Sequence, residues 1–197
     1  MGTRGVWGFR KNGHTIVTYH HFDSYPEGLG YSFVQFLKDN TNDQLSEAFD
    51  NIKEINVRVK PTDEQKQYCI DMGWFDGYVS DRSSDDWYCL LHKLQEPEQW
   101  QDAMDQGKEI YVDNYTSFLK DSLFCEYGYI YDIDCMMLEF YEGFQKKPQI
   151  DNPYGNTPNE DGYYPCRVAG LMMKWDIDDA PIDDIVKCMI GFGEDVE

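Results

Sequence analysis

Two adjacent histidines near the start of the chain, with the polar residues that follow them, are the side chains best suited to chemistry. In the sequence YHHFDSYP, His20 or His21 could act as a general base and Asp23 could orient it. Ser24 or Tyr25 could donate a hydrogen bond to an oxyanion, which would suit hydrolysis or phosphoryl transfer. A structural interpretation is simpler, because Asp-Ser is turn chemistry and a histidine at a strand end often satisfies a backbone carbonyl. We therefore assign no catalytic residue and keep His21, Asp23 and Tyr25 as candidates.

Thr3 is a further candidate nucleophile. Hydrolases with an N-terminal nucleophile place Thr, Ser or Cys at the mature end of a strand, where the free α-amine serves as the base. Removal of Met1 would leave Gly2 at that position, so the mechanism requires an additional cleavage. The chain also lacks the P-loop, zinc-protease and serine-hydrolase motifs, which lowers the expectation of an enzyme.

Metal and cofactor chemistry find little support in the residue spacing. Asp132 and Asp134, like Asp176, Asp178 and Asp179, do not follow EF-hand spacing, and we interpret them as solvated turn residues. No C-x-x-C pair occurs, which argues against structural zinc and indicates reduced, packed cysteines. We predict no metal and no cofactor. The six cysteines are Cys69, Cys89, Cys125, Cys135, Cys166 and Cys188.

Charge is the strongest signal in the composition. The 197 residues include 17 Lys and Arg against 37 Asp and Glu, so the net charge is −20. Such a surface repels DNA, RNA and anionic membranes, and we expect none of them as a direct partner. Residues 151–197 alone hold eleven acids and three bases.

Two explanations of this charge remain open. Solubility alone would account for it. Alternatively, carboxylates that stand in for phosphates could bind a basic groove on another protein. On the second explanation, the predicted partner-binding residues are Asp176, Asp178, Asp179, Asp183 and Asp184.

The N-terminal segment predicts a β-hairpin followed by a helix. Residues 6–10 and 15–19 have the composition of short strands, and Asn12-Gly13 supplies the positive φ that a tight hairpin needs. A bend rich in proline and glycine then leads into residues 31–37, where apolar residues recur at helical spacing.

The middle of the chain predicts mainly helices. Thr62 and Gln65 form a capping box, Ser84 can cap the next helix, and Pro97 suits the first turn of another. The predicted helices span residues 42–52, 62–72, 84–95 and 97–107, followed by a strand at 110–112 and a helical turn at 115–119.

The C-terminal part returns to strands. Aromatic and β-branched residues predict a hairpin of residues 124–131 with 136–140. Residues 145–165 predict a long irregular segment, before a strand at 166–175 and a helix at 181–190. We therefore predict an α+β fold of a single domain, with an antiparallel sheet built from the N-terminal and C-terminal hairpins and a mainly helical middle segment packed on it. No membrane span or export signal is evident, so we expect a soluble, cytoplasmic protein.

Several motifs together point to a family. The opening pattern TRGxxGF…YxHxDSYPxGLG, followed by DDWYCLL, DSLFCEYGYIYDID and LEFYEGFQKKP, resembles an uncharacterised family of bacterial and phage proteins over most of the chain. The resemblance implies no catalytic residue, but it suggests a phage or mobile-element origin. Members of that family have Tyr-Asn-His where this chain has Tyr19-His20-His21, which favours His21 over His20 for any shared role.

Charge and resemblance together lead to the functional prediction. Small, very acidic phage proteins often block host defence by occupying the nucleic-acid groove of a nuclease, and this chain is similar in charge. We predict a non-enzymatic acidic interaction protein, a phage-encoded inhibitor that binds a basic, nucleic-acid-binding host defence protein. The alternative is a hydrolase or transferase that uses the region from Thr3 to Tyr25.

Overall fold

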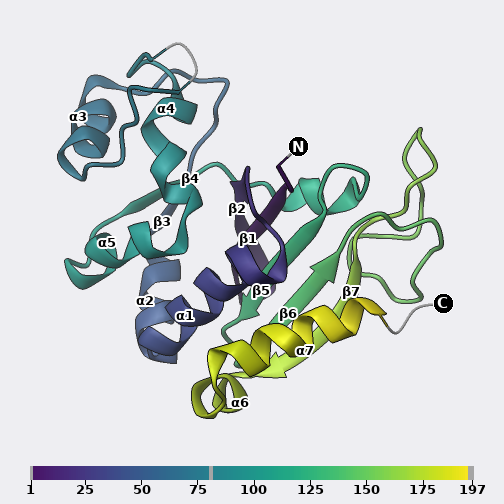
Figure 1. The fold of residues 1–197 in the computed structure, drawn as a ribbon. Helices are drawn as coiled ribbons and strands as arrows, with labels where there is room; N and C mark the ends of the chain where they lie inside the picture. Colours follow the sequence, from purple (N-terminus) through teal and green to yellow (C-terminus); the bar gives the residue numbers. More distant parts are fainter. Residues whose placement is uncertain (1, 80–81, 195–197) are drawn as a thin grey trace.

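A five-stranded sheet runs through the centre of the computed structural model, which describes residues 2–79 and 82–194 (Figure 1). Its strand order is β2-β1-β5-β6-β7, and helices pack around it. The prediction of an α+β fold whose N-terminal and C-terminal strands share one sheet is confirmed. The strands are β1 (Gly5–Lys11), β2 (His14–His20), β5 (Tyr127–Asp132), β6 (Met137–Glu142) and β7 (Arg167–Met173).

The two predicted hairpins are joined by a parallel strand pair. β1 pairs with β2 and β5 with β6 in antiparallel register, as expected. Between them β1 and β5 run parallel, with Gly5 opposite Tyr127 and Arg10 opposite Asp132. Parallel strands need a long crossover connection, and here most of the chain between β2 and β5 supplies it. The sheet is therefore mostly antiparallel, and the sequence patterns did not predict this one parallel pair.

The N-terminal hairpin follows its local sequence closely. Asn12 and Gly13 both have positive φ, at 51° and 74°, as a tight turn between twisted strands requires. Gly8 lies opposite Val17, and a Cβ at Gly8 would come within 2.2 Å of the Ile16 carbonyl oxygen. The two strands therefore approach each other so closely at this point that only glycine fits.

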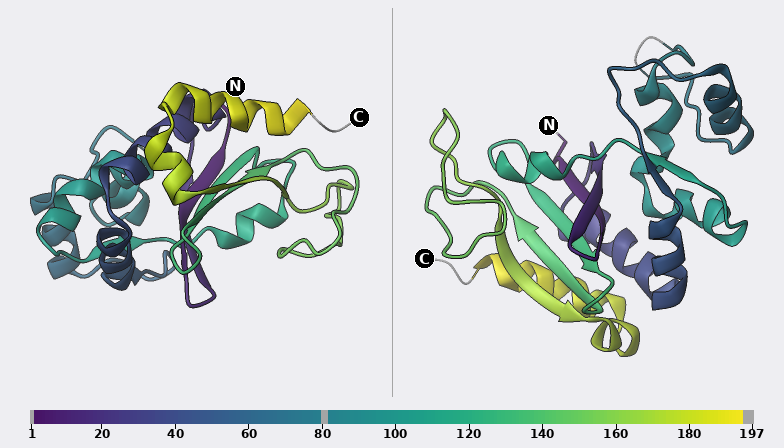
Figure 2. Two further views of the ribbon diagram at one scale, coloured as in Figure 1. Left: turned by 90° about the horizontal axis from the view of Figure 1, so that it is seen from below. Right: turned by 180° about the vertical axis from the view of Figure 1, so that it is seen from behind.

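Alternating side chains give the sheet two covered faces. The helices α1 (Tyr31–Asp39), α6 (Lys174–Asp179) and α7 (Ile182–Glu194) cover one face of the sheet, as the two views of Figure 2 show. Trp7 and Phe9 point to this face, where their rings pack on Phe33 of α1. The opposite face holds a smaller cluster under the irregular segment 145–165 and the short helix η4 (Thr116–Lys120). That cluster consists of Val6, Val17, Leu119, Cys125, Ile130, Tyr141 and Cys166.

The middle of the chain forms a helical lobe, residues 42–112, beside the edge of the sheet (Figure 1). One cluster of buried residues continues from Trp7 in the sheet through Trp100 to Cys69 in the lobe. The single domain stays a prediction, and this shared core is consistent with it. The lobe contains α2 (Asn42–Asp50), β3 (Ile52–Glu54), α3 (Asp63–Asp71), α4 (Trp87–Leu91), η2 (His92–Gln95), η3 (Pro97–Trp100), α5 (Gln101–Asp105) and β4 (Ile110–Val112).

Most capping signals are confirmed, and one is displaced. The Thr62 hydroxyl accepts from Gln65 N at 3.2 Å and the Gln65 side chain accepts from Thr62 N at 2.9 Å, which completes the predicted capping box. The cap of α4 is Asp86, whose carboxylate accepts from Tyr88 N at 2.9 Å, and not Ser84. The carboxylate is the stronger acceptor at a helix N-terminus, so it outcompetes the earlier hydroxyl.

Several element ends differ from the predictions. α2 ends at Asp50 because Ile52 leaves the helix to pair with Ile110 in a small parallel ribbon. β5 begins at Tyr127, after a turn at 122–124 that the aromatic composition concealed. β7 ends at Met173, and the residues that follow it form α6 and not more strand or a turn. α7 extends to 194, beyond the predicted end at 190.

Candidate functional site

Thr3 ties the N-terminal segment to the bend after β2. Its Oγ1 accepts a hydrogen bond from Ser24 N at 2.9 Å, and its carbonyl oxygen lies 3.2 Å from Ser24 Oγ, which donates to it. The side chain that could serve as a nucleophile is thus engaged in holding the bend. This geometry gives Thr3 a structural use.

His21 and Asp23, the candidate base and its orienter, are not brought together. His21 Nδ1 hydrogen-bonds to Tyr19 Oη at 2.6 Å, and the ring stacks edge-on against Phe22 with centroids 4.3 Å apart. Asp23 is exposed, has a φ of +53°, and accepts from Leu29 N through its backbone carbonyl at 2.9 Å. Asp23 therefore shapes the bend, and Tyr19 orients His21.

Tyr25 also belongs to the bend. Its carbonyl accepts from Gly28 N at 3.0 Å and from Gly30 N at 3.3 Å, which starts the one-turn π-helix η1 (Pro26–Gly30) that leads into α1. A Cβ at Gly28 would lie 2.0 Å from the Asp23 carbonyl oxygen. The sequence DSYPEGLG is accounted for by this close-packed turn.

His20, which the family resemblance made the less favoured of the two histidines, has side-chain hydrogen-bond contacts at both ring nitrogens. His20 is 4% exposed, and its Nδ1 lies 2.9 Å from Ser24 Oγ while its Nε2 lies 3.2 Å from Glu96 Oε1. The order Ser–His–Glu is that of a hydrolase triad. Ser24, however, is fully buried and its hydroxyl also donates to Thr3 O, so no substrate atom can reach it. The chain of contacts fastens the bend to the lobe.

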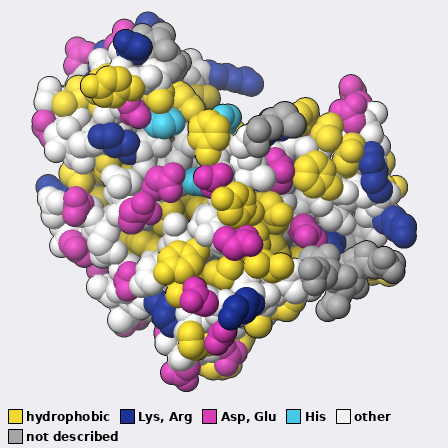
Figure 3. Space-filling view, in the orientation of Figure 1, with side chains coloured by type: hydrophobic (Ala, Val, Ile, Leu, Met, Phe, Trp, Pro, Cys, Tyr) yellow, Lys and Arg dark blue, Asp and Glu magenta, His cyan; other side chains and the backbone are white. Residues whose placement is uncertain are grey.

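Next to this chain lies a hollow with several titratable groups, which we call the polar hollow. It has a volume of about 500 Å³, and His92 Nδ1 within it pairs with Asp76 Oδ2 at 3.0 Å. Histidine side chains gather beneath the upper part of the helical lobe in Figure 3. Among the described residues that line the polar hollow, no nucleophile is hydrogen-bonded to a base. The hollow therefore contains polar groups but no catalytic arrangement. It is lined by His21, Phe22, Asp76, His92, Lys93, Gln95, Glu96 and Gln99.

A second cavity, the aromatic pocket, opens where the edge strand β2 meets the lobe. Its volume is about 190 Å³ and its walls come from β2, β4, α4 and η2. Tyr19 packs on Tyr115 with centroids 5.3 Å apart, and Trp87 packs on Tyr111 at 5.8 Å. The lining residues are Thr18, Tyr19, Val57, Asp86, Trp87, Tyr88, Leu91, Leu94, Gln95, Tyr111, Val112, Asp113 and Tyr115.

One carboxylate of the aromatic pocket is held in an unfavourable environment. Burial raises the pKa of Asp113 above its ordinary value, and the adjacent Tyr115 hydroxyl offsets only part of this rise. Burial and the charge of Asp113 together raise the pKa of Tyr115 to about 12. No Lys or Arg of the described residues contributes to the pKa of Asp113. Within residues 2–79 and 82–194, this acid lies in an aromatic wall without a cationic partner.

The Asp113→Asn variant is expected to be more stable than the wild type at neutral pH. Because its folded-state pKa is raised, ionised Asp113 costs stability above that pKa, and the cost vanishes as the pH falls below the ordinary value of 3.8. Urea unfolding at several pH values should therefore show a stability gain near pH 7 that disappears near pH 3. Asp102→Asn, at an exposed acid of the lobe, is the matched control. A loss of stability in Asp113→Asn at pH 7 would contradict the assignment.

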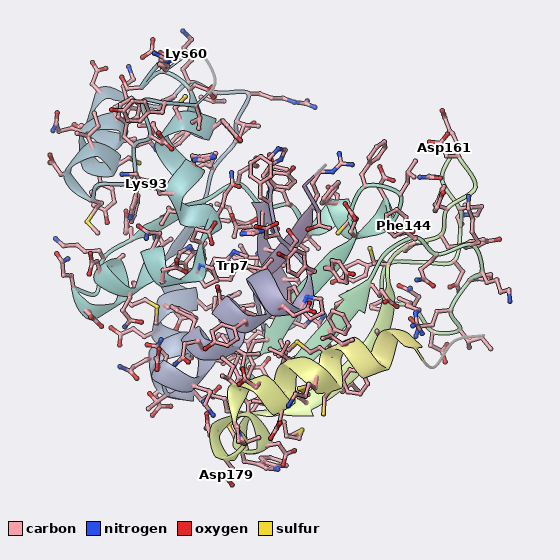
Figure 4. The ribbon with its side chains drawn as sticks, in the orientation of Figure 1. Trp7, Lys60, Lys93, Phe144, Asp161 and Asp179 are labelled. Atoms are coloured by element: carbon pink, nitrogen blue, oxygen red, sulfur yellow. The ribbon has the colours of Figure 1, made fainter. Side chains whose placement is uncertain are left out.

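The predicted partner-binding acids lie at the other end of the molecule, on α6 and α7. All five are exposed, and Figure 4 shows Asp179 at the end far from Lys60 in the lobe. Lys174 pairs with Asp178, and Lys187 pairs with Asp184 at 3.1 Å. Whether these carboxylates bind a partner stays a prediction, but they are accessible to one.

The acids considered for calcium do not converge. Asp132 Oδ2 lies 3.4 Å from Arg10 Nη1 and Asp134 accepts from Asn12 N, so both acids are engaged in contacts between the two hairpins. Among residues 2–79 and 82–194, no group of three or more His, Cys, Asp or Glu could hold a metal ion. None of the six cysteines, all of them in the described part of the chain, forms a disulfide; Cys135 and Cys188 are exposed and the others are buried.

Only the contacts within the segment from Thr3 to Tyr25 could be expected from the local sequence. Thr3 and His20 both contact Ser24 within this segment, but the further contact of His20 to Glu96 and the nearby pair His92–Asp76 involve the lobe. Glu96 is 76 positions from His20, so no short sequence motif could indicate that the two residues meet. The aromatic pocket was missed for the same reason.

Comparison with known proteins adds no relationship. No protein-family model, curated protein or solved structure matches the chain. The family resemblance seen in the opening motif therefore stays a prediction. Within the part of the chain that the structure describes, no helix is both long and apolar enough to span a membrane.

Proposed function

We propose that the protein is an acidic interaction protein that binds the basic surface of another protein. The observation that carries this proposal is the charge: 37 acids against 17 bases leave 20 carboxylates that the chain's own Lys and Arg cannot balance one for one. Acidic side chains are spread over the face shown in Figure 3. Such a field attracts basic surfaces and repels nucleic acid.

The proposed contact is the end of the molecule formed by α6 and α7. Lys38 Nζ donates to the carbonyls of Ile177, Asp178 and Ala180 at 2.6–2.9 Å, which anchors the C-terminal end of α6 to α1. The five aspartates are thus presented on a fixed support and not on a loose tail. A rigid row of carboxylates loses little conformational entropy on binding.

The proposed partner is a nucleic-acid-binding defence protein of a bacterial host, which the acidic protein would inhibit as a phage product. This finer proposal rests on the resemblance to bacterial and phage proteins and on the ability of carboxylates to take the place of phosphates in a basic groove. The enzyme alternative is weaker, because Thr3, Asp23 and Tyr25 are engaged in the bend and His21 does not contact Asp23.

Binding should depend strongly on salt and on the α6–α7 acids. We expect purified defence nucleases with basic grooves to bind at low salt, to lose about tenfold or more in affinity as screening increases, and to release a DNA duplex in competition. Replacing the five acids with asparagine should weaken binding about tenfold. The five are Asp176, Asp178, Asp179, Asp183 and Asp184.

A charge-matched variant separates a local contact from the overall field. Neutralising five exposed acids of the lobe gives the same net charge of −15, from −20 plus 5, and should weaken binding much less. The proposal fails if no basic nuclease binds at low salt or if affinity is insensitive to salt. The control acids are Asp43, Glu47, Glu64, Asp71 and Asp102.

A further inference from the structure

The aromatic pocket combines two features that a cationic ligand requires. Its walls include Tyr19, Trp87, Tyr88, Tyr111 and Tyr115, and aromatic rings attract cations through their negatively charged faces. Its lining also holds two carboxylates and, among the described residues, no Lys, Arg or His. Anionic ligands are therefore disfavoured, and a purely apolar ligand would add to the burial of the Asp113 carboxylate without supplying an opposite charge.

The two carboxylates reach the pocket from separate elements. Asp86 is fixed as the cap of α4, where it accepts from Tyr88 N at 2.9 Å. Asp113 follows β4 directly and is half-buried beside Tyr115. A cation in the pocket would thus meet negative charge from both sides, and it would relieve the unfavourable burial of Asp113.

The size of the cavity restricts what can enter. Its volume of about 190 Å³ is below the about 300–1,000 Å³ of sites for drug-sized ligands. One long side chain would fill it. Arginine and lysine carry an apolar stem with a charged head, which suits an opening lined by both Leu91 and carboxylates.

We infer that the aromatic pocket binds the cationic side chain of an arginine or lysine presented by a basic partner protein. This inference rests on the proposed function for the source of the side chain, but the pocket's affinity for the cation can be measured without any partner. The pocket lies between β2 and the lobe, away from α6 and α7 (Figure 1). It would therefore form a second contact, which fixes how the partner's basic surface is oriented on this protein. Such anchoring residues at interfaces are often arginines that enter preformed pockets.

The test uses three short glycine-flanked peptides on the full-length protein. They differ only in the central residue, which is arginine, lysine or citrulline, the neutral isostere of arginine. Binding is followed by NMR at the indole N–H of Trp87, which donates to Val59 O at 2.8 Å beside the pocket. We expect the arginine or the lysine peptide to bind with a dissociation constant in the millimolar range and citrulline to bind at least tenfold more weakly.

Variants assign the binding to the pocket. Asp113→Asn should weaken the cationic peptide about tenfold, and since this variant is expected to be stable, the loss would not reflect unfolding. Tyr88→Ala should weaken it about two- to fivefold, with rescue by Tyr88→Phe. Asp102→Asn, outside the pocket, should leave it unchanged.

Two results would overturn the inference: citrulline binding as tightly as arginine, or neither cationic peptide shifting the Trp87 signal. These results differ from a failure of the proposed function. If basic proteins bind but the peptides do not, the acidic surface acts without the pocket. If the peptides bind but no basic nuclease does, the pocket is real and the proposed partner is wrong.

Discussion

Replacing Trp7 with alanine is expected to lower the free energy of unfolding by about 3–5 kcal/mol. Trp7 is fully buried, and its ring lies 4.8 Å from that of Trp100 and 5.3 Å from that of Phe33, measured between centroids. Figure 4 shows it where the sheet meets the lobe. Its Nε1 also donates to Gln95 O at 2.6 Å, so the variant would leave a buried carbonyl without its donor.

The Trp7 contact also supports both cavities, because Gln95 lines the polar hollow and the aromatic pocket. Trp7→Ala should therefore disturb the Trp87 indole signal as well as stability. Trp175→Ala is the matched control, since Trp175 is 53% exposed and its loss should cost no more than about 0.5 kcal/mol. Equal urea midpoints for the two variants would disprove this account of the core.

The second large effect is expected at the ion pair that bridges the two hairpins. Arg10 on β1 makes a bidentate contact with Glu139 on β6, with Nη1–Oε1 and Nη2–Oε2 distances of 2.6 and 2.8 Å. Both side chains are mostly buried, at 19% and 13% exposed. Burial lowers the pKa of Arg10, but the hydrogen bond and charge of Glu139, together with smaller contributions from Tyr141, outweigh burial and raise it. Removing either partner, as in Arg10→Met or Glu139→Leu, should cost about 3–5 kcal/mol because the other charge stays mostly buried without its bidentate partner. In Glu139→Leu, Arg10 keeps the longer contact with Asp132 at 3.4 Å, so this variant should lie at the lower end of the range.

The double variant Arg10→Met/Glu139→Leu should lose clearly less than the sum of the two single variants. Urea unfolding of all four proteins gives the coupling directly. The same cycle on the exposed pair of Lys187 with Asp184 provides the comparison, where the coupling should stay below about 1 kcal/mol. Additive losses at Arg10 and Glu139 would mean that the pair has no special role.

How far the sequence predicts this molecule depends on how local each signal is. Asn12-Gly13 and the Thr62–Gln65 box act through neighbouring backbone groups, and both are found as expected. α6 was missed because the predicted strand was extended through Trp175, and the aspartates that follow were interpreted as turn residues. Its aspartates are exposed, as predicted for solvated acids, but they lie on a helix.

The candidate site also shows that sequence patterns predict local contacts but not contacts between distant segments. The segment from Thr3 to Tyr25 carries the residue types of a catalytic centre, yet its hydrogen bonds are those of a turn. The net charge of −20 remains as the main support for the proposed function, because it follows from composition alone and does not depend on how the chain folds. The aromatic pocket could not be predicted, because Tyr19, Trp87 and Asp113 come from three distant segments and meet only in the folded chain.

The parallel pairing of β1 with β5 has a consequence for how the protein is made. The first residue of β5, Tyr127, is synthesised 116 residues after the last residue of β1, Lys11, from 127 minus 11. At a ribosomal rate of about 5–20 residues per second, that interval is on the order of ten seconds. During this time one edge of the newly made β1 has no partner, and its unpaired backbone N–H and C=O groups can pair with other chains. Translation speed and chaperone access during this interval should therefore affect the yield of folded protein.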